Sequence, residues 1–391
     1  MRQSSEEVRV TRSEAVDLTV IIVNFNVAPL VLQAVASLEP QRFAAIDGRE
    51  GRLEVLVVDN ASSPDDRACL QRLPAHVVQI LNSENLGFGR ANNQAILQAR
   101  GRYLCFLNPD TVVLGGALDA LLRYLYQHPE AGAVGPRIWI DADRQWQLPP
   151  GDPPTLSFCV QRMLADCSRR LGERMSRTWH RRAVRCWSSG TPVSVLMLSG
   201  ACLMTSRRIL DEVGGFDPGY FLYYEDTDWC RRVSQSGYQL HQVPGAEIVH
   251  YYNQSAKSSS GTARRYAVES QARFIRSHYG RAGTGLYALA QAARKRFAGR
   301  QRRANGADVI DLGRCRVPPR FAMPDGRTSS PILTQIGYDP LFVPSIAGFV
   351  HDRELCLSSG FWERLEAGRY YTRVIESDTF TPLGIWTWEK A

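Results

Sequence analysis

Residues 18–23, Leu18-Thr-Val-Ile-Ile-Val23, are the most informative stretch for the architecture, because five of the six are β-branched and none is charged. A continuous apolar run of this length is typical of a strand buried on both faces, as in a parallel sheet. The segment Leu53-Glu-Val-Leu-Val-Val58 has the same character. A helical stretch over about residues 29–38 separates the two, as a crossover between parallel strands requires.

Two further predicted strands continue this alternation. Val77–Leu81 and Tyr103–Leu107 are strand-length apolar runs, and residues 88–99 between them have a helical pattern. Strands that alternate with helices predict an α/β fold with a Rossmann-like, mostly parallel sheet flanked by helices.

Polar clusters stand directly after three of the predicted strands, at Asn24–Asn26, Asp59-Asn60 and Asn108–Asp110. In open α/β sheets, ligands bind beyond the carboxyl ends of the strands. The sequence therefore predicts one functional site at that edge of the sheet.

Composition divides the chain into segments of different character. Residues 151–190 carry eight Arg against three acidic residues, and six basic residues fall between Arg294 and Arg303. The expected division is a flexible lead (1–17), a main domain (18–280) with a basic helical insert (151–190), a basic amphipathic helix (281–304), a linker (305–330) and a small β-rich domain (331–391). The two basic helical segments are interpreted either as solvated helices packed on the core or as acceptor-side or membrane-surface elements.

The charge balance favours anionic partners. Lys and Arg total 47 against 39 Asp and Glu, a net charge of +8, which suits phosphates, anionic lipid or nucleic acid. Nucleic-acid binding is not expected, because the arginine runs lie outside the alternating core and no reader module is recognisable.

Compartment signals indicate a reduced environment. The nine cysteines include no CxxC pair, so they are interpreted as reduced thiols. The polar N-terminal stretch does not resemble a secretory signal, and no apolar run approaches the roughly 18 residues of a membrane span. A cytoplasmic protein is expected, with peripheral attachment to the inner membrane face as an alternative.

Five segments in order resemble the family 2 glycosyltransferases, most closely the non-processive, rhamnosyltransferase-like branch. They are Val20–Asn26, Val57–Ser62, Asn85–Asn93, Leu107–Asp110 and Gly214–Cys230, and the resemblance covers about residues 18–255. It implies a GT-A fold, a nucleotide-sugar donor, a divalent metal and inversion at the anomeric carbon. A processive synthase is disfavoured, because the sequence has neither spanning segments nor a Gln-x-x-Arg-Trp motif.

The resemblance assigns nucleotide-sugar binding to a set of residues near the strand ends. Asp59 is expected to read the nucleobase, usually uracil or thymine, which implies a dTDP or UDP type of donor; a helix N-cap is the alternative. The loop that opens the helix at 88–99 offers glycines for close backbone approach and a helix N-terminus that favours phosphate, or it is an ordinary turn. The expected set is Asn24, Asn26, Asp59, Asn85, Gly87, Arg90, Asn93 and Asn108.

The resemblance also implies a metal site for Mg²⁺ or Mn²⁺. Asn108-Pro109-Asp110 occupies the place of the family's Asp-x-Asp motif, with Asn replacing the first acid, so Asp110 is the expected protein ligand and His250 completes the site. The alternatives are a type I turn at Asn108–Asp110 and a packed His250.

The acidic segment Glu225-Asp226-Thr227-Asp228 is the expected catalytic motif. Inverting transfer needs a general base for the acceptor hydroxyl, and the resemblance assigns that role to Asp226. Glu225 is expected to orient the acceptor or share the proton, and Asp228 to cap a helix that begins near Trp229. Three acids in four residues repel one another unless a cation or protonation relieves them.

The function expected from these residues is inverting transfer of a sugar, rhamnose being favoured. The donor is a nucleoside-diphosphate sugar and the acceptor a hydroxyl of a lipid-linked glycan or a polysaccharide. The alternative is a catalytically inactive relative that binds nucleotide-sugar or glycan.

Overall fold

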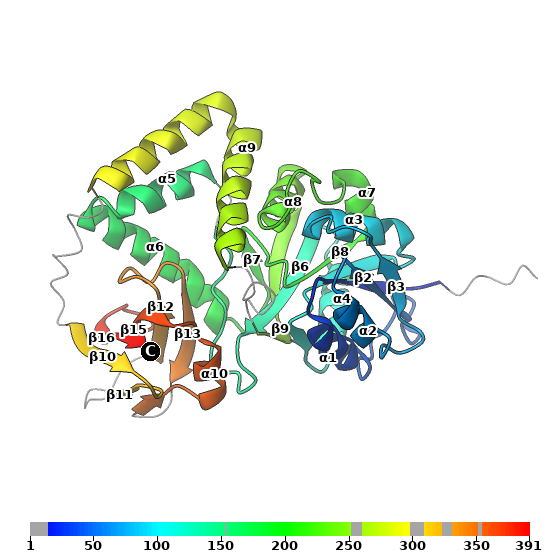
Figure 1. Cartoon of the computed structure of the whole chain (residues 1–391), viewed down its shortest axis with the longest axis horizontal. Coiled ribbons are helices and arrows are strands. Elements are labelled where there is room, and N and C mark those ends of the chain that lie inside the picture. The colour runs from blue at the N-terminus through cyan, green and yellow to red at the C-terminus, as the bar shows by residue number, and fades with distance from the viewer. Residues whose placement is uncertain (1–14, 153–154, 252–259, 298–308, 323–330, 351–353) are drawn as a thin grey trace, which may run out of the picture.

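The computed structural model describes residues 15–152, 155–251, 260–297, 309–322, 331–350 and 354–391. Most of the expected lead 1–17, residues 298–304 of the expected basic helix, and residues 305–308 and 323–330 of the expected linker lie outside this part. Figure 1 shows the main sheet and its helices on one side of the molecule, and a helical lobe with a second sheet on the other.

Four parallel strands form the first half of the main sheet, as the sequence predicts. They are β1 (Leu18–Asn24), β2 (Leu53–Asp59), β3 (Val78–Leu81) and β4 (Tyr103–Leu107), in the order β3-β2-β1-β4. The helices between them are α1 (Ala28–Leu38), α2 (Pro64–Leu70) and α3 (Phe88–Gln98). The expected α/β architecture is confirmed.

The second half of the sheet is mixed. It contains β5 (Thr111–Val113), β6 (Ala131–Trp139), β8 (Cys202–Ser206) and β9 (Gln239–His250). Strand β8 runs antiparallel to both β4 and β6, whereas β6 and β9 are parallel. The helices here are α4 (Ala117–Gln127), α7 (Arg207–Val213) and α8 (Glu225–Gln235).

The run Val193–Met204, which suggests a single strand, is divided in the structure. Strand β7 (Val193–Val195) pairs with β9, whereas β8 begins only at Cys202 and pairs with β4. Because β7 and β8 pair with different strands, residues 196–201 form a connection between them. This connection contains Gly200 and lies in the candidate site described below.

Helices cover both faces of the main sheet because successive β1 side chains point to opposite sides. Val20 and Ile22 pack in one buried cluster with residues of α1 and α4, and Ile21 and Val23 pack in another with residues of α3 and α8. Burying a Val or Ile side chain contributes about 1.5–3 kcal/mol, so these two cores hold the strand ends in fixed positions.

The expected helical insert consists of two helices, α5 (Leu156–Ala165) and α6 (Arg169–Ser188). A third helix, α9 (Ser260–Phe297), packs against α5 and begins well before the expected start at 281. Its backbone leaves helical geometry at Gly280, where φ is 60° and ψ is −157°. The basic segment is thus the second arm of a bent helix. No helix in the described ranges is both long and apolar enough to cross a bilayer.

The second sheet begins earlier than expected. Strands β10 (Val309–Cys315) and β11 (Arg320–Ala322) lie in the segment expected to be a linker, and β10 pairs in parallel with β16. The weak alternation of the β10 sequence conceals a strand that pairs at the edge of the sheet. The other elements are β12 (Ile332–Gly337), β13 (Ser345–Val350), β14 (Glu354–Cys356), α10 (Ser359–Arg364), β15 (Gly368–Glu376) and β16 (Pro382–Lys390).

The second sheet is joined to the rest of the chain by backbone and side-chain contacts. Gln147 and Ala347 exchange backbone hydrogen bonds of 2.7 and 3.1 Å. On α6, the buried His180 accepts at Nε2 from the guanidinium of Arg373 at 2.7 Å. Burial and the charge of Arg373 lower the pKa of His180 to about 3, so its imidazole is neutral and suited to accept this bond.

Candidate active site

The carboxyl ends of β1 and β2 carry a buried polar network. Asn24 and Asp59 are register partners, and Asn24 Nδ2 donates to Asp59 Oδ1 at 3.0 Å. The Asp59 side chain is 0% exposed, and its Oδ2 also accepts from Arg67 Nε at 2.5 Å. The carboxylate expected to read a base therefore has internal partners on both oxygens. It is not a helix cap, because Ser63 caps α2.

Asn26 lies exposed beside this network. Its backbone is left-handed, with φ of 58°, and its Oδ1 accepts from the backbone N–H of Ser63 at 2.8 Å. Asn and Gly tolerate this region of backbone space better than other residues. The turn after β1 is thus tied to the turn after β2.

The loop before α3 packs against the segment that precedes α8. Asn85 Oδ1 accepts from the Gly87 backbone N–H at 2.9 Å and from Nδ2 of the buried Asn60 at 2.8 Å. Gly87 has φ of 84°, and a Cβ there would lie 2.4 Å from the carbonyl oxygen of Phe221. Gly87 is therefore required for close approach to protein backbone. Asn60 organises the loop and is absent from the expected site set.

Arg90 and Asn93 bind the same segment. Arg90 Nε donates to the Pro218 carbonyl at 2.8 Å. Both groups of the Asn93 amide bond the backbone of Phe216, at 2.7 and 2.8 Å. The side chains expected at a phosphate thus fasten the segment leading to the acidic motif.

Three of the expected donor-site and metal-site residues converge at the ends of β4 and β9. Asp110 Oδ1 lies 3.0 Å from His250 Nε2, and Asn108 Nδ2 lies 3.5 Å from the same nitrogen. The Asp110 and His250 side chains are 4% and 7% exposed. Within the described ranges, no three His, Cys, Asp or Glu side chains form a metal-binding group. A carboxylate beside an imidazole still supplies oxygen and nitrogen ligands of the type that Mn²⁺ accepts.

The connection 196–201 joins this pair to the acidic motif. The Ala201 carbonyl accepts from the Asn108 backbone N–H at 2.9 Å. The N–H of the preceding residue, Gly200, donates to Asp226 Oδ2 at 2.9 Å. Two adjacent residues therefore contact the Asn108–Asp110 turn on one side and Asp226 on the other.

The acidic motif begins α8 at a strained backbone. Tyr223 and Tyr224 both adopt left-handed conformations, with φ of 66° and 68°. Such residues cost about 1–3 kcal/mol each and are found mainly at functional sites. The first turn of α8, with Glu225 and Asp226, follows directly on these two residues.

The two leading carboxyl groups lie in different surroundings. Glu225 is buried, and burial followed by the charge of Asp226 raises its pKa to about 8. Its Oε2 makes no hydrogen bond to the described residues. Asp226 is partly exposed, and burial raises its pKa despite hydrogen bonds from Gly200 and Thr227. Protonation of Glu225 thus relieves the expected repulsion.

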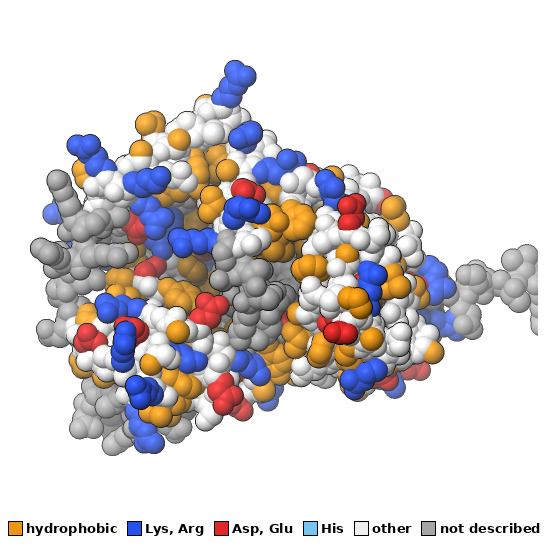
Figure 2. Space-filling model, in the orientation of Figure 1, with side chains coloured by type: hydrophobic (Ala, Val, Ile, Leu, Met, Phe, Trp, Pro, Cys, Tyr) orange, Lys and Arg blue, Asp and Glu red, His pale blue; other side chains and the backbone are white. Residues whose placement is uncertain are grey.

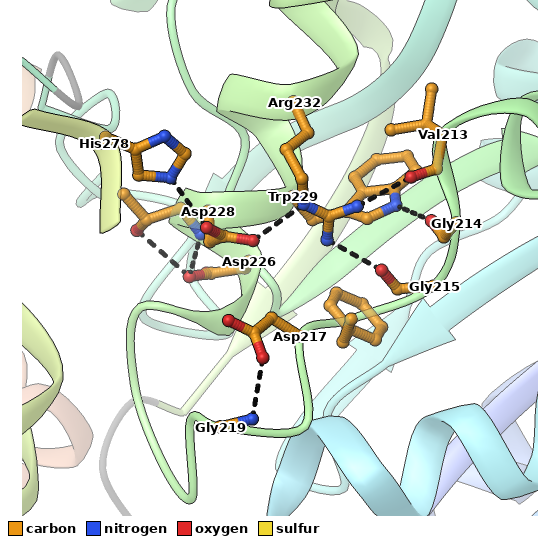
Figure 3. Close-up of polar contacts among 12 residues, drawn as sticks. Val213, Gly214, Gly215, Asp217, Gly219, Asp226, Asp228, Trp229, Arg232 and His278 are labelled. Atoms are coloured by element: carbon orange, nitrogen blue, oxygen red, sulfur yellow. Dashed lines mark hydrogen bonds and ion pairs between the residues drawn. The ribbon is translucent and has the colours of Figure 1, made fainter. Parts of the chain in front are cut away.

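Asp228 does not cap a helix, because α8 already begins at Glu225. Its carboxylate pairs with Arg232 Nε at 2.8 Å and with His278 Nε2 at 2.7 Å (Figure 3). Arg232 in turn donates to the carbonyls of Val213 and Gly215. Asp228 therefore holds α8 to the preceding segment and to α9.

Sequence reasoning did not find the role of the first arm of α9. This arm contacts the segment that precedes α8 through Ser270, which donates to the Leu222 carbonyl at 2.9 Å, and through Arg273, which pairs with Asp217 at 2.8 Å. Gln271 Nε2 also donates to the Tyr224 hydroxyl at 2.7 Å. No local pattern signals these contacts, because the partners lie about 50 residues apart in the chain.

The chain is similar to known proteins in sequence and, more distantly, in structure. Residues 19–214 match the family described as Glycosyl transferase family 2. N-acetylglucosaminyl-diphospho-decaprenol L-rhamnosyltransferase of Mycobacterium tuberculosis is 31% identical over 246 residues, which cover 60% of this chain and 76% of the relative. Rhamnosyltransferase WbbL of Escherichia coli is 26% identical over 232 residues, covering 57% and 81%. A solved mannosyltransferase, PcManGT from Pyrobaculum calidifontis in complex with GDP-Man and Mn²⁺, is 18% identical with a TM-score of 0.42, covering 73% of this chain and 76% of that one.

The family match runs from β1 to the end of α7 and covers half of the chain. It includes Asp59 and Asp110, whereas Asp226 and His250 lie beyond it. The expected family resemblance, including the similarity to rhamnosyltransferases, is confirmed. The chain belongs to glycosyltransferase family 2.

Proposed function

We propose that this chain is an inverting glycosyltransferase that moves a sugar from a nucleoside-diphosphate donor to a hydroxyl group of a lipid-linked glycan or polysaccharide. Rhamnose is the favoured sugar, because two relatives carry rhamnosyltransferase names. The donor is of dTDP or UDP type. The observation that carries the proposal is the pair of contacts made by Gly200 and Ala201, which place Asp226 and the Asn108–Asp110 turn around one short connection.

Asp226 is the proposed general base. It accepts the proton of the acceptor hydroxyl while the hydroxyl oxygen forms its bond to C1 of the sugar. The bond from C1 to the diphosphate oxygen breaks on the opposite side, the diphosphate leaves with the electron pair, and the configuration at C1 inverts. The partial burial that raises the pKa of Asp226 makes its carboxylate a stronger base than an exposed aspartate.

Glu225 is proposed to act as a neutral neighbour. With a pKa of about 8 it retains its proton at pH 7. A protonated carboxyl donates a hydrogen bond and adds no second negative charge beside Asp226. Glu225 would therefore keep Asp226 ionised and orient the acceptor or an adjacent backbone group.

A divalent cation, Mg²⁺ or Mn²⁺, would be held by Asp110 and His250. Their 3.0 Å approach and their low exposure fit a site with one carboxylate and one imidazole ligand. Such an ion neutralises the charge that develops on a departing diphosphate. Asn108, whose Nδ2 lies 3.5 Å from His250 Nε2, would contribute an amide to the donor phosphate or to the ion's outer ligands.

A panel of nucleotide sugars, assayed for donor hydrolysis and transfer with Mg²⁺ or Mn²⁺, tests the proposal. Activity with one dTDP- or UDP-sugar that is lost in Asp226→Asn, while nucleotide binding persists, is the expected result. Nucleotide binding without turnover in the unmodified protein would instead identify an inactive binding relative. Retention of configuration in the product would contradict the role of Asp226.

A further inference from the structure

Helix α9 has two arms with different surroundings. The first, before Gly280, contacts residues 217–224, which precede α8, through Ser270, Gln271 and Arg273, and Asp228 of α8 through His278. The second, residues 281–297, packs on α5 through Tyr287 and Ala290 and leaves its outer side to solvent. Figure 1 shows the second arm at the outer border of the helical lobe, away from the main sheet.

The outer side of the second arm combines apolar and basic side chains. Leu286, Leu289 and Phe297 are 49%, 70% and 39% exposed. Their spacing of three and eight residues places them along one side of a helix. Arg296 is exposed next to Leu289 on this side, and Lys295 is exposed about 100° further round the helix. Figure 2 shows hydrophobic and basic side chains together along this border.

The charge of α9 has one sign over most of its length. Residues 270–297 contain six Arg or Lys and no acidic residue. Arg294 pairs with Asp166, the residue that follows α5, whereas Lys295 and Arg296 form no ion pair with the described residues. An exposed apolar stripe beside cations matches a bilayer surface, where the apolar side chains enter the acyl boundary and the cations meet anionic headgroups.

We propose that the second arm of α9 docks the protein on an anionic lipid surface. The docking itself does not depend on the proposed function, but its consequence does. Because the first arm of the same helix holds the segment that carries Asp226, docking would orient the proposed active site toward a lipid-linked acceptor. Nucleic acid fits this face poorly, because it offers no apolar surface for Leu289. Helix α6 provides a basic face for contrast. Its Arg174, Arg177 and Arg181 are exposed, but Leu171 is its only exposed large apolar side chain.

The test is co-sedimentation of the full chain with vesicles of phosphatidylcholine containing phosphatidylglycerol, and with vesicles of phosphatidylcholine alone. We expect binding to the anionic vesicles that weakens with salt. The triple variant Leu289→Ser, Lys295→Gln, Arg296→Gln should lower the partition coefficient at least about tenfold. A control that removes three charges from α6, Arg174→Gln, Arg177→Gln, Arg181→Gln, should lower it much less.

Absence of binding by the unmodified chain, or an equal loss in both variants, would overturn the assignment of this face. Donor hydrolysis, assayed in solution without vesicles, tests the proposed function independently of membrane binding. The α9 variant should keep hydrolysis, because its three positions lie outside the candidate site. Vesicle binding by a chain without any transferase activity would leave the docking face standing and refute the enzyme proposal.

Discussion

The backbone N–H of Gly200 donates a 2.9 Å hydrogen bond to Oδ2 of Asp226, and the next residue's carbonyl bonds the turn that carries Asp110. A Cβ at residue 200 would lie 3.1 Å from the same carboxylate oxygen. This contact links the candidate base to the candidate metal site through two consecutive residues. It also orients Asp226, because one carboxylate oxygen is held while Thr227 bonds the other.

Asp226 and Glu225 should respond differently when the carboxyl group is replaced by an amide. Asp226→Asn should lower kcat about 100- to 10,000-fold, the usual contribution of a general base. Glu225→Gln should keep kcat at pH 7 within about tenfold, because glutamine resembles the protonated carboxyl that is present there. Steady-state transfer assays on both variants measure this. An equal loss in both would mean that Glu225 acts as a carboxylate.

The buried Glu225 should make the free energy of unfolding depend on pH. Its pKa is raised in the folded chain, from an ordinary value of 4.5 to about 8. Between these pH values the folded state binds more protons than the unfolded state. The contribution of Glu225 to the free energy of unfolding is therefore fully present below pH 4.5 and is lost as the pH rises through 8. The slope is at most about 1.4 kcal/mol per pH unit. Urea unfolding from pH 5 to 9 should show a smaller decline in Glu225→Gln; parallel curves would contradict the raised pKa.

Asp110 and His250 should control metal dependence. Asp110→Ala and His250→Ala should each raise the Mn²⁺ concentration needed for half-maximal activity at least about tenfold, since loss of even an outer partner has that effect. Chelation of divalent ions should stop transfer by the unmodified protein. His241→Ala is the matched control, because His241 is a buried histidine on the same strand whose ring lies 5.3 Å from that of Tyr124 in a tilted arrangement. An unchanged Mn²⁺ requirement in both ligand variants would remove the metal assignment.

Gly87 should not tolerate a side chain. Gly87→Ala would combine a positive φ with a Cβ 2.4 Å from the Phe221 carbonyl, and should lower stability by about 1–3 kcal/mol. Because the same contact positions the segment before α8, activity should fall as well. Gly115→Ala provides the comparison, since a Cβ there meets no atom within 4 Å. Thermal unfolding of the two variants distinguishes them, and similar melting temperatures would show that the loop yields without cost.

Local patterns predicted much of the main sheet. The four parallel strands and the helices α1 and α3 follow from apolar periodicity, which acts over a few residues, whereas α2 was not among the predicted helices. The division of β7 from β8 could not be predicted this way, because each piece is defined by its partner strand, β9 or β4. Strand β10 escaped detection for the same reason, since its pairing with β16 joins segments more than 70 residues apart.

The candidate site was predicted by residue type more than by contact. The sequence by itself determined that amides and carboxylates follow the strands. Because strands that alternate with helices have their carboxyl ends at one edge of the sheet, it also predicted that these side chains lie together. The structure brings Asn108, Asp110 and His250 into contact. Only the tertiary structure decided that Arg90 and Asn93 bind protein carbonyls and that His278 reaches Asp228. The physical reason is that a guanidinium or an amide can donate a hydrogen bond either to a phosphate or to a peptide carbonyl. The choice is made by whichever partner the packed chain brings within 3 Å.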